Sequence, residues 1–228
     1  MLGLYLSWSE FYIGIYQKNQ GETVSVGTTK ETIKKAAINL FYKKSYFATA
    51  MSNIALDSNI RKASIYHHYA SKEDILFDIL MTTMNALDAY IDNCLHGVEN
   101  IENRMRAAVR AHVKFHCDNQ KEVLISDTEL RGLTAKNYKA FVALRDAYEK
   151  KFQDMIARGI DQGYFAAGDV KVISYAILTM CTAVANWFKP DGRLSGDQIS
   201  TIYEELVITI LLKESLPLHC LETPVFRQ

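Results

Sequence analysis

Cationic, hydroxyl and small side chains occur together in one short segment of the chain. It contains Arg61, Lys62, Ala63, Ser64, Tyr66 and His67. Guanidinium and ammonium groups bind phosphates or guanine edges, hydroxyl groups bind phosphate oxygens, and small residues allow close approach. If these side chains share the outer face of a helix, the pattern favours a surface that enters the major groove of DNA.

Two short helices joined by a tight turn would present this surface. Asn59 stands at the corner, and asparagine tolerates a left-handed backbone better than most residues other than glycine. Thr49 is the expected N-cap of the first short helix. Apolar residues on both sides of the turn can hold the two helices at a fixed crossing angle: Ile54, Ala55, Ile60 and Ile65. The pattern therefore predicts a helix-turn-helix.

The rest of the chain also predicts helices. The only three prolines are at positions 190, 217 and 224, so glycine and turn chemistry must end helices elsewhere. Thr28 and Glu31 form an expected capping box at the first helix, and Ser71 is expected to cap a long helix that ends near Asn93. Later helices are predicted over 101–119, 121–131, 134–162, 169–188 and 195–213. An all-α fold of about nine helices follows.

The predicted organisation has three parts. Residues 1–27 form an apolar, aromatic extension, which lacks the basic start and the cleavage site of a signal peptide. Residues 28–75 form the helix-turn-helix domain, and residues 76–228 form a helical domain for ligand binding and dimerisation. No apolar run is expected to reach the roughly 18 residues of a membrane helix. The four cysteines form no Cys-x-x-Cys pair, which suits a reducing cytoplasm.

Charge is unevenly distributed along the chain. The 26 basic and 26 acidic residues cancel overall, but residues 28–75 hold eight basic and four acidic side chains. A basic module on an acidic body is expected when one end of a protein faces phosphates.

Residues 28–80 resemble the DNA-binding domain of the TetR (tetracycline-repressor) family. The segments TIKKAAINLF, ATAMSNIALDSN and IRKASIYHHYASKEDIL are similar to the three helices of that domain. The most specific part is Tyr66-His67-His68-Tyr69 followed by Ser71-Lys72-Glu73. Two positions depart from the family pattern: Asn59 replaces the usual glycine, and Arg61 replaces a small capping residue.

The resemblance implies roles for individual positions. Thr28, Thr49, Tyr66, His67 and Lys72 match phosphate-contacting positions, and Arg61, Lys62 and Ser64 match positions that reach base edges. It also implies a homodimer on a palindromic operator, because one short helix buries too little surface for specificity. Helix 169–188 is apolar nearly all round, helix 195–213 carries an apolar stripe, and the resemblance implies that both pair with their copies.

The second half resembles a TetR subgroup tied to fatty-acid, sterol or acyl-CoA metabolism. The similar segments are 145–149 (RDAYE) and 187–192 (WFKPDG). This resemblance implies a repressor that a small hydrophobic or acyl-CoA-type effector releases from DNA, without a cofactor. The effector pocket is expected to be lined by Met84, Leu87, His112, His116, Tyr148, Asn186 and Trp187.

Two other functions remain open on the sequence alone. His112 and His116 are spaced i, i+4 on one helix face and could hold a metal in a metal-responsive regulator, although no third ligand is fixed by the sequence. A helical interaction protein without DNA binding is a further alternative, against which Arg61, Lys62 and Lys72 argue. No glycine-rich phosphate loop, serine elbow or nucleophilic cysteine motif indicates an enzyme.

Overall fold

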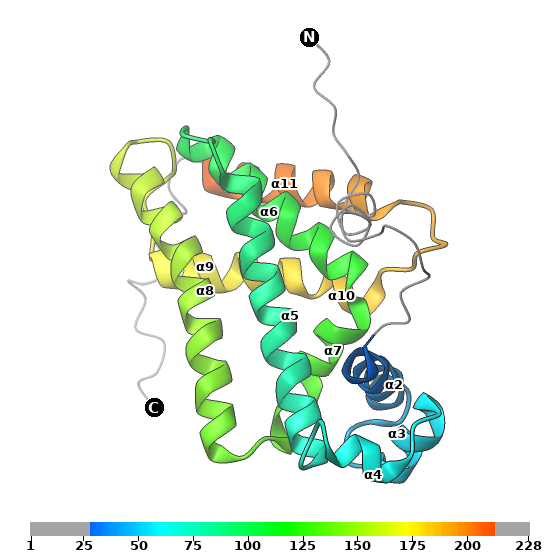
Figure 1. Ribbon diagram of the computed structural model, residues 1–228. Helices are drawn as coiled ribbons and strands as arrows, with labels where there is room; N and C mark the ends of the chain where they lie inside the picture. The colour runs from blue at the N-terminus through cyan, green and yellow to red at the C-terminus, as the bar shows by residue number, and fades with distance from the viewer. Residues whose placement is uncertain (1–27, 213–228) are drawn as a thin grey trace, which may run out of the picture.

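The computed structural model describes residues 28–212, and every regular element in this range is a helix (Figure 1). The first four are α2 (Thr29–Lys44), α3 (Met51–Ser58), α4 (Lys62–Tyr66) and α5 (Lys72–Leu95). They are followed by α6 (Ile101–Asp118), α7 (Gln120–Thr128), the 3₁₀ turn η1 (Leu130–Gly132), α8 (Ala135–Asp161), α9 (Val170–Thr182), α10 (Val184–Trp187) and α11 (Gly196–Leu212). The predicted all-α fold is confirmed. The extension 1–27 and Lys213 lie outside the described residues.

Local capping chemistry starts several helices where the sequence predicted. The Thr28 hydroxyl accepts a hydrogen bond from the Glu31 amide, and the Glu31 carboxylate accepts one from the Thr28 amide. Ser71 and Asp74 form the same reciprocal pair at the start of α5. Each such box satisfies two backbone donors that would otherwise lack a partner.

Two details of the predicted helices were wrong. The N-cap of α3 is Ala50, whose amide donates to the Asn53 side chain at 2.8 Å, because the Thr49 hydroxyl donates instead to the Ser45 carbonyl. The helix predicted over 169–188 is divided at Ala183 into α9 and α10. At this break the Gln120 side chain of α7 donates to carbonyl groups of the α10 region.

The small helices α2, α3 and α4 pack at one end of α5 (Figure 1). Their core consists of fully buried or nearly buried side chains: Ile33, Ala37, Phe41, Ile54, Ile65 and Tyr69. Each large apolar side chain buried in this way contributes about 1.5–3 kcal/mol. Asn59 occupies the corner between α3 and α4 with φ +54° and ψ +35°, which confirms the predicted left-handed turn.

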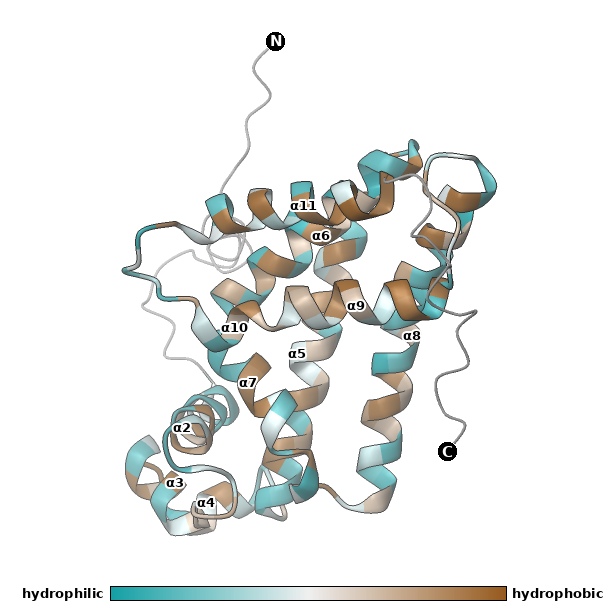
Figure 2. Ribbon diagram, turned by 180° about the vertical axis from the view of Figure 1, so that it is seen from behind, coloured by the Kyte–Doolittle hydropathy of each residue, from teal (hydrophilic) through white to brown (hydrophobic). Residues whose placement is uncertain are grey.

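The remaining helices form a larger body around α6, which packs against α5, α8 and α11. Figure 2 shows α9 and α11 on the face opposite to that of Figure 1, with apolar residues along both helices. Helix α5 is continuous across residue 75, so the two predicted domains share one helix.

One apolar segment is long enough to cross a membrane by length and composition. It is the 18-residue window Val170–Trp187, which has a mean hydropathy of 1.3 and is 28% buried. This finding corrects the expectation that no segment reaches that length. The window spans α9 and α10, and much of its apolar surface is exposed on the outside of the helical body.

The turn at Asn59 provides a test of the helix-turn-helix geometry. Asn59→Val should lower the free energy of unfolding by about 1–2 kcal/mol, because a β-branched residue is strained in the left-handed conformation. Asn59→Gly should stay within about 0.5 kcal/mol of wild type. Urea denaturation followed by circular dichroism measures both. Equal effects of the two substitutions would contradict the assigned turn.

Candidate nucleic-acid interface and effector pocket

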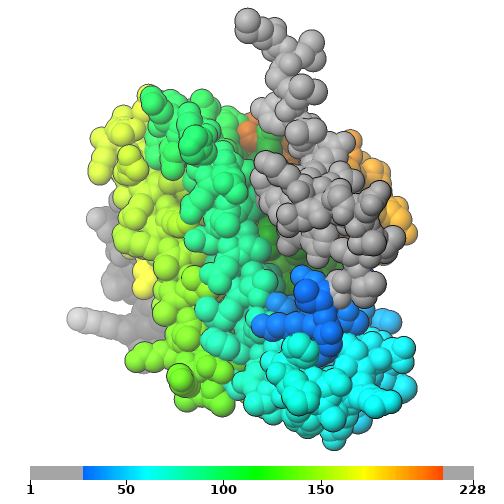
Figure 3. Space-filling model, viewed as in Figure 1, coloured from blue at the N-terminus to red at the C-terminus, as the bar shows by residue number. Residues whose placement is uncertain are grey.

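The outer face of α4 is exposed as the sequence predicted. Arg61, Lys62, Ala63, Tyr66 and His67 are exposed, and Ser64 is half-buried. The fully buried Ile65 holds the opposite face of the helix in the core. In Figure 3 these residues fall within the cyan end of the molecule, which protrudes from the body.

The side chains of this face are available for a ligand. The Arg61 side chain makes no hydrogen bond or ion pair with the described part of the chain. The backbone carbonyl of Arg61 accepts a hydrogen bond from the Ser64 amide at 2.8 Å, at the start of α4. The Lys62 ammonium lies 6.0 Å from the centre of the Tyr66 ring. The face therefore combines free cations with an exposed aromatic hydroxyl, as a DNA-contacting helix requires.

Lys72 has a different environment from the one that the sequence suggested. Its ammonium donates to the Tyr46 carbonyl at 2.7 Å and to the Thr49 carbonyl at 2.6 Å, and it lies 4.1 Å from the centre of the Tyr46 ring. Burial lowers its pKa, and the Glu129 carboxylate offsets part of that effect. Lys72 therefore fastens the start of α5 to the loop between α2 and α3, and the phosphate contact expected from the family resemblance stays a prediction.

Thr28 and Thr49 also differ from each other. Thr28 is exposed at the N-terminus of α2, where backbone amides favour an anion. Thr49 is only 2% exposed and its hydroxyl is already bonded to Ser45, so its position does not favour a phosphate contact.

The module and the body meet at the turn between α7 and α8. A Cβ atom added at Gly132 would lie 2.6 Å from two carbons of the Tyr46 ring, so only glycine allows this contact. Beside it, Glu73 of α5 accepts hydrogen bonds from the Thr134 amide and the Asn137 side chain at the start of α8. These contacts between the module and the body were not predicted from the sequence, because their residues are distant along the chain.

A cavity of about 420 Å³ lies within the body, lined by α5 to α10. It includes six of the seven residues expected in the pocket: Met84, Leu87, His112, His116, Tyr148 and Asn186. The prediction for Trp187 was wrong, because its side chain is not part of the cavity lining. Trp187 is half-exposed and stacks on Tyr203, with ring centres 6.4 Å apart. The adjacent Asn186 lines the cavity from the same short helix.

Several lining residues were not predicted. Phe141 and Arg145 of α8 lie on the same stripe as Tyr148, at a spacing of four and then three residues. That spacing could have identified them. Asp127 of α7 also lines the cavity. The residue is exposed overall, but desolvation against the cavity wall raises the pKa of its carboxyl group, and the Arg145 charge partly offsets the rise.

The two histidines of the cavity form a stacked, neutral pair. Their ring centres are 4.0 Å apart with an interplanar angle of 17°. The Nδ1 atom of His112 contacts the Tyr148 hydroxyl at 2.7 Å and its Nε2 contacts the Thr182 hydroxyl at 3.1 Å. Burial lowers the pKa of His116 to about 4, and burial followed by the nearby His116 holds the pKa of His112 well below its usual value.

This geometry does not favour the metal-responsive alternative. Both ring nitrogens of His112 are engaged by hydroxyl groups, and the two rings face each other instead of converging on one point. Across residues 28–212, no group of three His, Cys, Asp or Glu side chains is arranged to hold a metal ion.

Helices α9, α10 and α11 leave large apolar side chains exposed. The side chains are each about half-exposed or more: Val172, Tyr175, Trp187, Ile202, Leu206, Ile210 and Leu212. Single exposed apolar residues are ordinary on soluble proteins, but a contiguous group of them marks an interaction surface.

Comparisons with known proteins agree with this architecture. Residues 33–79 match the family profile of the bacterial regulatory proteins of the tetR family, and residues 98–211 match the tetracyclin repressor-like C-terminal domain. The HTH-type transcriptional repressor KstR2 of Mycobacterium tuberculosis is 24% identical over 197 residues, which cover 84% of this chain and 96% of that repressor.

Two solved structures share both fold and sequence. The TetR family transcriptional regulator PfmR from Thermus thermophilus is 29% identical with a TM-score of 0.73, covering 78% of this chain and 97% of its own. AibR, solved with isovaleryl coenzyme A and operator DNA, is 26% identical with a TM-score of 0.72, covering 82% of this chain and all of its own. With an N-terminal helix-turn-helix and a C-terminal helical domain that both match, this chain belongs to the TetR family of bacterial transcriptional regulators.

Proposed function

We propose that the protein is a homodimeric repressor that binds a palindromic operator and leaves it when a small hydrophobic effector fills the cavity. One observation carries this proposal. An uncovered cationic helix, α4, lies at one end of α5, and a largely apolar cavity lies farther along the same helix. Since operator DNA is the proposed partner, we expect the protein to act in the cytoplasm.

DNA recognition is assigned to the free side chains of α4. Arg61, Lys62 and Ser64 are proposed to reach base edges, while Tyr66, His67 and Thr28 bind phosphates. Their exposure supports these roles. The same exposure argues against an interaction protein that has lost DNA binding, because such a protein has no need for unpaired cations on this face.

Dimerisation is assigned to the exposed apolar faces of α9, α10 and α11. Pairing these helices with their copies would cover the side chains of Val172, Leu206 and Ile210, which are otherwise in water. Two copies of α4 could then sit about one helical turn of DNA apart, roughly 34–36 Å.

The effector is proposed to act by shifting a population of conformations. The cavity contacts α5 through Met84 and Leu87, and α7 through Val123 and Asp127. Just beyond the end of α7, Gly132 packs on the Tyr46 ring next to the helix-turn-helix. A ligand that displaces α7 would therefore disturb the spacing of the two recognition helices.

An acyl-CoA or another hydrophobic compound is the proposed effector class. The largely apolar cavity lining supports it. Further support comes from AibR, a relative that has been solved with isovaleryl coenzyme A.

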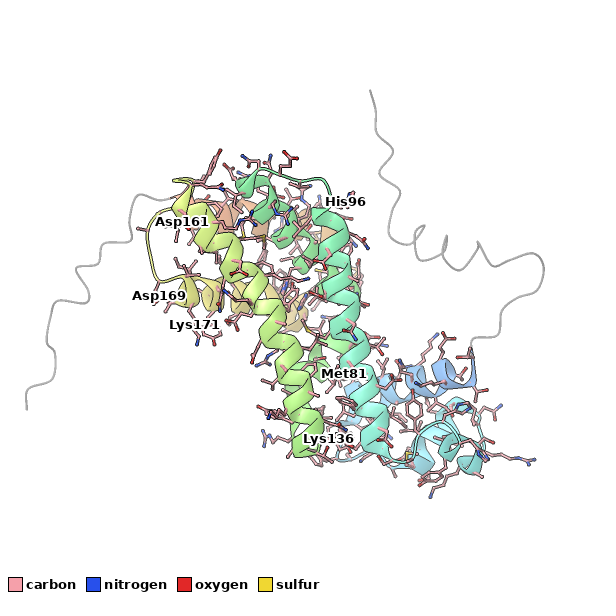
Figure 4. The ribbon with its side chains drawn as sticks, turned by 60° about the vertical axis from the view of Figure 1, so that its left-hand side comes forward. Met81, His96, Lys136, Asp161, Asp169 and Lys171 are labelled. Atoms are coloured by element: carbon pink, nitrogen blue, oxygen red, sulfur yellow. The ribbon has the colours of Figure 1, made fainter. Side chains whose placement is uncertain are left out.

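Substitution of Arg61 tests the proposed base contact. Arg61→Ala should weaken operator binding by about 1–3 kcal/mol and relax sequence preference at one base position of each half-site. Binding to a randomised operator library, read by sequencing, measures both effects. Lys171→Ala is the control, because Lys171 lies in the first turn of α9, at a distance from the helix-turn-helix (Figure 4). An unchanged preference with Arg61→Ala would remove Arg61 from base recognition.

Substitution of Lys72 distinguishes a role in fastening α5 from a contact with a DNA phosphate. Lys72→Met should lower the free energy of unfolding by about 1–3 kcal/mol, because two carbonyl groups lose a charged donor. The dependence of operator affinity on salt should keep its wild-type slope. A phosphate contact would instead reduce that slope by about one unit with little loss of stability. Chemical denaturation and a salt titration of binding distinguish the two outcomes.

The dimer surface is tested by introducing a charge. Leu206→Glu should give a monomer in analytical ultracentrifugation and abolish specific operator binding, because it buries an unpaired carboxylate in the interface. Tyr138→Glu is the matched control, since Tyr138 on α8 is equally exposed but lies on a different helix. A dimer that tolerates Leu206→Glu would exclude the proposed face.

A further inference from the structure

His116 is the most informative polar side chain in the cavity. It lines the cavity, is only 4% exposed and comes from the last turn of α6. Its Nδ1 lies 2.7 Å from the His112 carbonyl oxygen. A carbonyl oxygen can only accept, so Nδ1 must carry the proton and donate it.

The other ring nitrogen is therefore an acceptor. Burial lowers the pKa of His116 to about 4, so the ring is neutral at pH 7 and Nε2 presents a lone pair. No described residue donates a hydrogen bond to this nitrogen. Some buried side-chain atoms have neither solvent exposure nor a hydrogen-bond partner, and the Nε2 of His116 is not one of them. This fits an Nε2 that is open to the cavity.

The neighbours of His116 do not supply a donor. The stacked His112 has both ring nitrogens occupied by the hydroxyl groups of Tyr148 and Thr182. The charged residues of the lining are more exposed: Asp127 and Arg145 are exposed, and Glu149 is half-buried and accepts from Gln153. The cavity lining thus combines apolar side chains with the Nε2 of His116, an acceptor to which no described residue donates.

We propose that His116 selects an effector with a hydrogen-bond donor, a hydroxyl or an amide N–H, attached to an apolar body. The inference rests on the proposed function, because it assumes that the cavity holds the effector. A hydrocarbon, an ester or an ionised carboxylate cannot donate to Nε2. An acyl-CoA meets the requirement only if an amide of its pantetheine arm, or a hydroxyl on its acyl group, reaches His116.

Matched small probes test the proposal in the absence of DNA. Naphthol and methoxynaphthalene share the ring system and the oxygen, but only naphthol carries a donor proton, because a methyl group replaces that proton in methoxynaphthalene. The wild-type protein should bind naphthol about ten-fold more tightly, as a hydrogen bond to a buried acceptor predicts. His116→Phe keeps an aromatic ring at this position and should bring the ratio of the affinities for naphthol and methoxynaphthalene close to one. Arg145→Met, in the same lining, should retain the preference.

A second measurement uses the intact protein, so it does not depend on how a variant folds. In protein with isotope-labelled histidine, the Nε2 resonance of His116 should shift when naphthol binds and stay in place with methoxynaphthalene. Naphthamide against methyl naphthoate repeats the comparison for an amide donor and distinguishes it from a hydroxyl.

The outcomes are separable from those of the proposed function. Equal binding of naphthol and methoxynaphthalene, a preference that survives His116→Phe, or failure of every probe to bind would each overturn the role of His116. Release of operator DNA is measured separately. If the protein prefers ligands with a hydrogen-bond donor but does not release operator DNA when they bind, the proposed ligand class stands and the proposed control of DNA binding by the effector is rejected.

Discussion

The contact of Lys72 with the loop before α3 is the constraint on which the arrangement of the helix-turn-helix depends. Lys72 begins α5, where the helix dipole gives a cation no help. Two backbone carbonyl groups and the face of the Tyr46 ring stabilise its ammonium instead. Because α3 begins directly after this loop, the direction of α5 and the position of the short helices are coupled.

The same ring links the DNA-binding module to the body. One residue, Tyr46, contacts Lys72 of α5, Phe41 of α2 and Gly132 of η1. Few groups thus separate α7, which lines the cavity, from the turn that leads into α3. Close packing transmits small displacements, since such an interior has no free volume to absorb them. This arrangement gives a physical route for an effector to act on DNA binding without touching α4.

The cavity itself is built to stay uncharged in its inner part. Tyr148, Thr182 and His112 satisfy one another, and burial keeps both histidines neutral. Charged side chains stay where they are more exposed, as with Arg145. A pocket of this kind suits a largely apolar ligand with few polar atoms, and its hydrogen-bonding capacity decides which of these ligands fit.

The sequence by itself determined the all-helical fold, the capping boxes at Thr28 and Ser71, and the left-handed turn at Asn59, although not the break between α9 and α10. These features depend on residues within a few positions of each other, so local chemistry is sufficient to predict them. It also predicted the exposed face of α4, because Ile65 could only face the core. Six of the seven residues expected in the pocket line the cavity.

Only the tertiary structure decided what Lys72, Thr49 and Trp187 contact. Lys72 meets carbonyl groups 26 and 23 residues away, and Trp187 turns toward Tyr203 on another helix. The unused acceptor of His116 likewise depends on which donors the surrounding helices bring near it. A side chain's role follows from its partners in space, and partners this distant along the chain are set by how helices pack, which no local pattern encodes.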